Sequence, residues 1–236
     1  MLQDEYRQLY KRINKGWEDS VSLYKKLINK QIDKTTVVLD AGCGFSDLLK
    51  EEYERCKKVI GVDISPKFLA KNEWVDVKIV ANLESIPKIR DNSIDVIVSS
   101  WVFEHLKNPN RVFSEFYRIL KKGGKLIFLT PNALNGVILL NKMIPSLVRK
   151  FLIGKMSKDL ETDPMEAFYK ANSLMALKRL AKENNFRIEK IILNGDPTYI
   201  AVNKIFFYIG VISEKIASLS LLKNFRVHII GVMERM

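Results

Sequence analysis

Two closely spaced glycines and a downstream acid are the residues whose spacing most clearly points to chemistry. Gly42 and Gly44 follow a run of β-branched residues in the segment VVLDAGCGFSDLL. Glycine lets the backbone turn tightly and approach a ligand, and a helix that begins near Ser46 favours an anion at its start. The next apolar run ends at Asp63, where a carboxylate can accept hydrogen bonds from both ribose hydroxyls. Together these features predict a nucleoside site at the ends of two neighbouring strands.

A nicotinamide dinucleotide fits this loop poorly. The third small position of the dinucleotide fingerprint GxGxxG holds Asp47, whose carboxylate would oppose the pyrophosphate. A nucleoside that carries an amino acid fits better, because its carboxylate can lie at the helix start and its ammonium near Asp40. The loop therefore favours such a nucleoside. A nicotinamide-dependent oxidoreductase is the weaker alternative, and a tight turn that binds nothing is the purely structural one.

The elements that must position these residues alternate along the chain. Short β-branched runs separated by segments of helical pattern are typical of βαβ units and a parallel sheet. This pattern predicts a doubly wound α/β fold. The five runs between residues 35 and 131 are Thr35–Gly42, Lys58–Ile64, Val75–Asn82, Ser93–Ser100 and Gly124–Thr130. Further along the chain, the sequence predicts strands at Phe186–Asn194 and Arg226–Met233.

The remaining segments are predicted to be mainly helical. Residues 1–34 place apolar side chains at close to the helical period, so we expect one or two amphipathic helices that form a lid. Residues 35–236 form the main domain, with a substrate-side helical segment at 133–185 and an insertion at 195–225 between the last two strands.

Five ordered blocks give the chain a family resemblance. DAGCGFS, GVDIS, ANLESIPKIRDNSIDVIVSS, FEHLKNP and RILKKGGKLIFLTPN resemble class I S-adenosylmethionine-dependent methyltransferases, of a type 11/12-like group without assigned specificity. The resemblance implies a Rossmann-like, seven-stranded, mostly parallel sheet with helices on both faces. It also implies S-adenosyl-L-methionine as the cofactor and methyl transfer by in-line displacement. Positioning by the protein would supply much of the rate.

The resemblance also assigns cofactor contacts to individual residues. Gly42, Cys43 and Gly44 would border the methionine moiety. Asp63 with Ile64 would hold ribose and adenine, and Asn82 with Leu83 would meet the adenine edge. The family usually has aspartate where this chain has Asn82, so here a neutral carbonyl oxygen must accept from the adenine amine. Two residues that end the fourth strand are expected to meet the methionine end or to be merely small strand-end residues: Ser99 and Ser100.

The acceptor side is less defined. His105, just beyond the fourth strand, is a candidate general base for a hydroxyl or phenol, or else a packing histidine. Trp17, His105 and Tyr169 are expected to border the acceptor pocket, with Asn172 as a further contact. Small-molecule or lipid-linked acceptors are favoured, because we find no nucleic-acid recognition motif. The transferred methyl could go to oxygen, nitrogen or carbon.

Charge and composition bound the remaining choices. The net charge is +12, and residues 132–236 carry 16 basic against 9 acidic side chains. An amphipathic helix at 203–220 is expected to bind a membrane surface peripherally, or else to be buried against the sheet or a second subunit. The acidic N-terminus and the absence of a long apolar run predict a cytoplasmic protein, with the inner membrane face as a contact.

The two cysteines and two histidines have no ligand spacing, so no metal site is expected. A non-catalytic nucleotide-binding or scaffold protein on the same fold is the alternative from another class.

Overall fold

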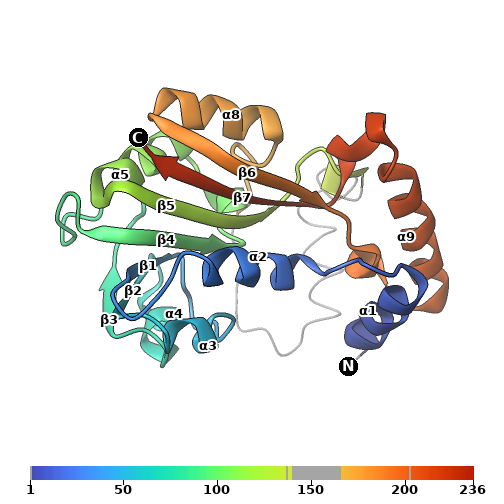
Figure 1. Cartoon of the computed structure of the whole chain (residues 1–236), viewed down its shortest axis with the longest axis horizontal. Coiled ribbons are helices and arrows are strands. Elements are labelled where there is room, and N and C mark those ends of the chain that lie inside the picture. Colours follow the sequence, from blue (N-terminus) through green and yellow to red (C-terminus); the bar gives the residue numbers. More distant parts are fainter. Residues whose placement is uncertain (1, 137, 140–165, 202) are drawn as a thin grey trace.

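One mixed sheet organises the chain, in the strand order β3-β2-β1-β4-β5-β7-β6 (Figure 1). The computed structural model describes residues 2–136, 138–139, 166–201 and 203–236. Strands β1 to β5 run parallel, and β7 is antiparallel to both β5 and β6. This arrangement confirms the predicted Rossmann-like sheet. The seven strands in the described residues are β1 (Val37–Ala41), β2 (Lys58–Asp63), β3 (Val77–Val80), β4 (Ile94–Ser100), β5 (Leu120–Pro131), β6 (Phe186–Asn194) and β7 (His228–Arg235).

Helices cover both faces because the central strands are buried on both. Residues 38–41 of β1 are all buried, as a strand between two helical layers must be. One layer holds α2 (Ser20–Asn29) and α3 (Lys50–Tyr53), and the other holds α5 (Pro109–Ile119) and α8 (Leu174–Glu183). The short helix α4 (Pro66–Lys71) contacts β2 and β3, and Ser65 caps it through the Phe68 N–H.

The N-terminal segment divides into two parts with different roles. Tyr24, Leu27 and Ile28 of α2 are almost fully buried. They pack against strand residues on the face of the sheet that α2 and α3 cover. This helix is therefore a layer of the core and not part of a lid, which corrects the prediction for residues 20–29. The physical reason is that its apolar stripe is buried by the sheet itself. Helix α1 (Leu2–Ile13) lies apart from the sheet.

The predicted insertion between the last two strands is present. It comprises the 3₁₀ turn η2 (Pro197–Ile200), helix α9 (Lys204–Ala217) and the 3₁₀ turn η3 (Ser220–Phe225). Phe207 and Val211 of α9 form a separate small core with Tyr10 of α1. Figure 1 shows α1 and α9 side by side at the end of the molecule where the parallel strands terminate.

Two local predictions differ from the structure. We expected a helix from Ser46 onward, but α3 begins only at Lys50, because the intervening residues form turns closed by Ser46 N–H to the Cys43 carbonyl and Lys50 N–H to the Asp47 carbonyl. Strand β5 begins at Leu120, earlier than predicted, where it pairs with Ile94 across a register shift. Most of the predicted helical segment 133–185 lies outside the described residues, and its last part is α8.

Candidate functional site

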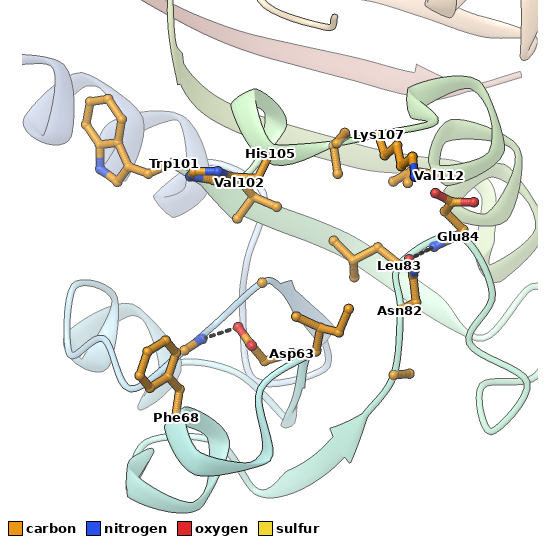
Figure 2. A pocket seen from close by; sticks show the side chains of 15 residues that line it. Asp63, Phe68, Asn82, Leu83, Glu84, Trp101, Val102, His105, Lys107 and Val112 are labelled. Atoms are coloured by element: carbon orange, nitrogen blue, oxygen red, sulfur yellow. Dashed lines mark hydrogen bonds between the residues drawn. The ribbon is translucent and has the colours of Figure 1, made fainter. Parts of the chain in front are cut away.

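A cavity of about 430 Å³ lies at the carboxyl ends of the parallel strands (Figure 2). The strand order reverses between β1 and β4, and in open α/β sheets ligands bind in the crevice at such a switch point. Figure 2 shows Asp63 and Phe68 on one side of the cavity and Val102 and His105 on the other. The lining residues are Gly42, Gly44, Asp63, Ile64, Phe68, Ala81, Asn82, Leu83, Glu84, Trp101, Val102, His105, Leu106, Lys107 and Val112.

The glycine loop after β1 forms the floor of this cavity. Gly42 has φ +79° and Gly44 has φ +49°, which is the left-handed region that favours glycine. A Cβ atom on Gly42 would lie 2.4 Å from Cγ2 of Val102, so any side chain here would clash with the opposite wall. The N–H groups of Gly42 and Cys43 both donate to the Val62 carbonyl, at 2.7 and 3.2 Å, which ties the loop to β2.

Asp63 ends β2 with its carboxylate held in place by the backbone. The Gly44 N–H donates to Oδ2 at 2.9 Å, and the Ser65 N–H donates to Oδ1 at 2.8 Å. Each oxygen keeps a further lone pair, and the side chain is only half-buried in the cavity wall. The carboxylate is therefore oriented before any ligand arrives and can still accept two hydroxyl hydrogen bonds.

Apolar side chains and one amide make up much of the remaining cavity wall. Leu83 and Phe68 provide apolar surfaces, and Asn82 and Ile64 complete the wall. The Oδ1 atom of Asn82 accepts the Glu84 N–H at 2.9 Å, a bond that Figure 2 marks. An amide oxygen has two lone pairs, so one acceptor position remains. The neutral carbonyl at position 82 is thus fixed by its own turn.

Four predicted cofactor contacts do not line this cavity. Asp40 is buried and accepts the Tyr53 hydroxyl, and burial raises its pKa to about 7. Cys43 is buried against Gly61, and burial raises the pKa of its thiol above the usual range. Ser99 is buried and donates to the Ala41 carbonyl at 3.0 Å. Ser100 is half-buried and also lies outside the lining. Asp40 and Ser99 thus hold the end of β1, and Cys43 borders a neighbouring hollow together with Gly42 and Gly44.

A second cavity, of about 400 Å³, shares Trp101 and His105 with the first. Trp101 has φ +58°, a conformation that is strained for a tryptophan, and it immediately follows β4. Its N–H donates to the Leu129 carbonyl at 2.9 Å, which holds the turn. The two residues therefore form a partition between the two spaces. The second cavity is lined by Arg7, Trp101, Glu104, His105, Pro131, Ala167, Tyr169, Asp196, Thr198, Tyr199 and His228.

His105 is oriented by a backbone carbonyl. Its Nδ1 atom lies 2.9 Å from the carbonyl oxygen of Glu166. A carbonyl can only accept, so Nδ1 carries the proton in the neutral ring and Nε2 keeps its lone pair. This is the tautomer that a general base requires, at the residue where the two cavities meet.

Burial shifts the pKa values of three groups that line the second cavity, Glu104, His228 and Tyr199. Burial raises the pKa of Glu104, which accepts the Thr130 hydroxyl at 3.2 Å. Burial lowers the pKa of His228 to about 4, so its imidazole is neutral near pH 7. Nearby charges act in opposite directions on His228, with Asp196 raising its pKa and Arg7 lowering it. Strongly shifted groups in one cavity are typical of functional sites.

The predicted acceptor contacts divide in the structure. Tyr169 lines the second cavity, and its N–H donates to the Glu104 carbonyl at 3.0 Å. Trp17 does not line it, because its Nε1–H donates to the Gly195 carbonyl at 2.8 Å and its ring packs against Tyr10. Asn172 is fully buried, and its Nδ2 donates to Thr130 Oγ1 and to the Pro131 carbonyl. Trp17 and Asn172 thus lie outside the lining of this cavity, and their side-chain N–H groups donate to other parts of the protein.

Sequence reasoning missed most of the second cavity. Its walls come from α1, from the turn after β4, from residues near 169, from the insertion and from β7. No short motif joins segments so far apart. The one usable signal was the position of Trp101, directly between the strand-end serines and His105. The missed residues are Arg7, Trp101, Asp196, Thr198, Tyr199 and His228 in the second cavity, and Phe68, Val102, Lys107 and Val112 in the first.

The fold and the first cavity define a class of protein. A β3-β2-β1-β4-β5-β7-β6 sheet with a glycine loop after β1 and an acid at the end of β2 is the arrangement of the class I methyltransferases. Residues 39–128 match the family described as a methyltransferase domain. Over this segment the chain is similar to the S-adenosylmethionine-dependent methyltransferases, and its sheet has their class I fold.

Individual relatives agree with this assignment. A malonyl-[acyl-carrier protein] O-methyltransferase from Yersinia pestis is 33% identical over 97 residues, which cover 40% of this chain and 36% of that protein. A ubiquinone biosynthesis O-methyltransferase from Idiomarina loihiensis is 25% identical over 180 residues, covering 71% of this chain and 69% of that one. The match to the Yersinia protein thus spans little more than a third of its length.

Solved structures show the same fold at low sequence identity. Geranyl diphosphate C-methyltransferase from Streptomyces coelicolor A3(2) has a TM-score of 0.59 and 14% identity. The comparison covers 91% of this chain and 77% of that one. At this identity the likeness concerns the fold alone.

Proposed function

We propose that the chain transfers a methyl group from S-adenosylmethionine to a small-molecule or lipid-linked acceptor. The observation that carries this proposal is the pair of cavities that meet at Trp101 and His105. The first cavity holds the residues proposed to bind a nucleoside, and the second is a separate space with several polar side chains in its lining. A reaction between two bound molecules needs two sites that share a wall, because the reacting atoms must come within about 3 to 3.5 Å.

The residues of the first cavity fit S-adenosylmethionine. Gly42 lets the loop pass directly against Val102, where a Cβ atom would clash, and Asp63 presents a carboxylate fixed by two backbone N–H groups. Asn82 and Leu83 lie where the adenine ring would be recognised. When bound, the cofactor supplies an electrophilic methyl group on a sulfonium sulfur. Asp40 and Ser99 support the end of β1 outside the cavity lining.

The protein's own contribution to the transfer is orientation and proton removal. His105 borders both cavities, and its Nε2 lone pair is free to take a proton because Nδ1 donates to the Glu166 carbonyl. This arrangement favours a hydroxyl or phenol as the acceptor, since such a group must lose a proton. Tyr169 and α1, through Arg7, wall the acceptor space, so the lid role proposed for residues 1–34 passes to α1 alone.

A peripheral membrane contact through α9 and η3 would suit a lipid-linked acceptor. The outer face of this insertion exposes large apolar side chains, and its exposed charges are the lysines 204, 215 and 223. The acid of the segment, Glu214, is buried and paired with Arg226 at 3.2 Å. An apolar face flanked only by cations is typical of helices that lie on anionic lipid. The exposed apolar residues are Ile205, Phe206, Tyr208, Ile209, Ile212, Ile216, Leu219, Leu221 and Phe225.

No helix of the described residues has the length and apolar character that crossing a bilayer demands. A contact through α9 would therefore lie in the plane of the membrane surface. The same insertion contributes Asp196, Thr198 and Tyr199 to the second cavity. A surface that touches lipid and a wall that touches the acceptor would thus belong to one continuous segment.

Calorimetry with the D63A variant tests the cofactor assignment. We expect the wild-type chain to bind S-adenosylmethionine and Asp63→Ala to lose about a hundredfold or more of that affinity, because charge-assisted hydrogen bonds contribute roughly 1.5 to 3 kcal/mol each. The matched control is Asp76→Ala, which removes a carboxylate that accepts the Val59 N–H and lies outside the cavity lining. Equal affinity of wild type and Asp63→Ala would refute the ribose assignment.

A further inference from the structure

His228 lies at the edge of the sheet where the parallel strands end. It is the first residue of β7, which is antiparallel, so it pairs with the last residues of β5 and β6, Pro131 and Asn194. Its ring is 3% exposed and lines the second cavity. The rings of Trp101 and Tyr199 meet it edge-on, with centroids 4.9 and 5.7 Å away. A buried imidazole thus faces the space assigned to the acceptor.

A hydrogen-bond chain determines which nitrogen of this ring carries the proton. Asn194 Nδ2 donates to the Glu18 carbonyl at 3.0 Å, which fixes the amide orientation, and also to Ser20 Oγ at 3.0 Å. Ser20 Oγ lies 2.8 Å from His228 Nδ1. If Nδ1 carried the proton, Ser20 Oγ would accept hydrogen bonds from both His228 and Asn194. Its own O–H would then have no acceptor among the described residues. The Ser20 O–H therefore donates to Nδ1, and the proton is on Nε2.

The Nε2–H group has no hydrogen-bond partner in the part of the chain that the structure describes. Leaving a buried donor without a partner costs roughly 1 to 3 kcal/mol, so such a group is usually satisfied by a ligand or water. With Nδ1 turned to Ser20, Nε2 is the polar atom that the ring can offer the cavity. Arg7 Nε, in the same cavity lining, likewise has no hydrogen-bond partner within the described residues.

The two carboxylates of this cavity are already engaged. Asp196 Oδ1 accepts both the N–H and the O–H of Thr198, and Asp196 Oδ2 is 4.0 Å from Arg7 Nε. Glu104 accepts the Thr130 hydroxyl. Burial keeps His228 neutral by lowering its pKa, so it offers a hydrogen bond without a charge. The N–H groups of His228 Nε2 and Arg7 Nε therefore still lack a hydrogen-bond acceptor within the described residues.

We propose that His228 Nε2–H, together with Arg7, binds a carbonyl or carboxylate oxygen of the methyl acceptor. This rests on the proposed function and narrows its substrate class to a hydroxyl compound that also carries such an oxygen. The two histidines then have opposite tautomers and complementary roles. His105 presents a lone pair that removes a proton, and His228 presents an N–H that positions the molecule.

The tautomers can be tested without any acceptor. The chain contains only two histidines, so ¹⁵N-histidine labelling yields two imidazole spin systems, and the H105N variant assigns them. We expect His228 to carry its proton on Nε2 and His105 on Nδ1 near neutral pH. Protonation of His228 on Nδ1 would overturn the proposal. In Ser20→Ala, the Nδ1 atom of His228 loses its hydrogen-bond donor, so we expect a mixture of both tautomers. If His228 served only in packing, this substitution would leave the tautomer unchanged.

Binding is tested with small aromatic probes on protein saturated with S-adenosylhomocysteine. Benzoate carries a carboxylate, benzamide carries a carbonyl, and toluene carries no oxygen. We expect benzoate or benzamide, and not toluene, to shift the His228 Nε2–H resonance, and the stronger of the two identifies the oxygen type. Absence of a shift with both oxygen probes, or an equal shift with toluene, would overturn the proposal.

Two substitutions separate the two nitrogens of His228. His228→Asn keeps an acceptor for Ser20 but removes the Nε2 donor, and it should weaken the preferred probe about tenfold. His228→Gln restores an N–H near the Nε2 position and should recover most of that loss. Equal affinity in wild type and His228→Asn would refute the donor role. Failure of S-adenosylhomocysteine to bind would instead refute the proposed function, while the tautomer measurement on the unliganded chain would stand by itself.

Discussion

At the scale of residues, His105 and His228 show how backbone position selects chemistry. Both rings border the second cavity, yet His105 gives Nδ1–H to the Glu166 carbonyl and His228 receives at Nδ1 from Ser20. The first ring keeps a lone pair on Nε2, and the second keeps a proton there. The same side chain can therefore act as a base in one place and as a donor in the other.

The base role of His105 predicts a specific kinetic loss. Asparagine at position 105 can still donate to the Glu166 carbonyl but has no Nε2 lone pair. We expect H105N to lower the turnover of a phenolic acceptor by about 10² to 10⁴ fold, the usual contribution of general base catalysis. Affinity for S-adenosylmethionine should stay unchanged, as measured by calorimetry. An unaltered turnover would leave His105 as a packing residue.

The buried state of His228 predicts a pH dependence of stability. Its folded pKa is lowered to about 4 from an ordinary 6.5, so the unfolded chain binds the proton first as pH falls. The stability that the neutral ring contributes is present above pH 6.5 and is lost between pH 6.5 and 4. Relative to His228→Asn, the wild type should lose up to about 3 kcal/mol across that window, at ~1.4 kcal/mol per pKa unit. Urea unfolding at several pH values measures this difference, and parallel curves for the two proteins would contradict it.

At the scale of elements, the N-terminal helices serve two different parts of the molecule. The buried side chains of α2 belong to the sheet core, whereas α1 packs on α9 and brings Arg7 to the second cavity. The ring of Tyr6 stacks on Phe207 at 4.8 Å, which joins α1 to the insertion. The two helices should therefore respond differently to removal.

Deletion of residues 1–16 should separate acceptor use from cofactor binding. None of the residues that line the first cavity comes from α1, so we expect S-adenosylmethionine affinity to persist while methyl transfer falls. The contrasting change is Ile28→Ala in α2, where loss of a buried side chain should cost about 2 to 5 kcal/mol of folding free energy. Calorimetry, transfer assays and urea unfolding give the three readouts. Full activity of the deletion variant would show that α1 is dispensable for the acceptor site.

At the scale of the whole molecule, the outer face of the insertion is an apolar surface that no other described residue covers. Ile205 and Leu221 are 71% and 90% exposed, and the regional charge of the exposed lysines is positive. Exposed apolar patches of this kind mark sites of interaction. In contrast, Phe207 and Val211 on the inner face of α9 are consumed by packing.

Vesicle binding should depend on this face and on lipid charge. We expect the wild type to sediment with phosphatidylglycerol vesicles at low salt and less so at high salt, because screening weakens the attraction of the lysines. The double variant Ile212→Glu with Ile216→Glu should abolish sedimentation. Met175→Glu on α8 is the matched control, since it also replaces an exposed apolar side chain by an acid. Absence of vesicle binding by the wild type under all salt conditions would exclude the membrane contact.

The sequence by itself determined the order of the elements and the position of the glycine loop after β1. The β-branched runs, Gly42 with Gly44, and Asp63 are local signals, because a turn and a strand end are set by residues close together in the chain. These predictions of type and order are confirmed by the sheet, although several boundaries moved by a few residues. The burial of α2 against the sheet could not be predicted, because an amphipathic pattern does not specify which surface packs on the apolar side of a helix.

Only the tertiary structure decided the acceptor side. Arg7 and His228 stand at opposite ends of the chain and line one cavity because α1 packs on the insertion and β7 runs antiparallel. The antiparallel direction brings the first residue of β7 to the edge where the parallel strands end. Trp17 and Asn172 are predicted acceptor contacts, but neither lines the cavity, and their side-chain N–H groups donate to backbone carbonyls elsewhere. Pairings across such separations depend on strand direction and packing, which no local pattern specifies.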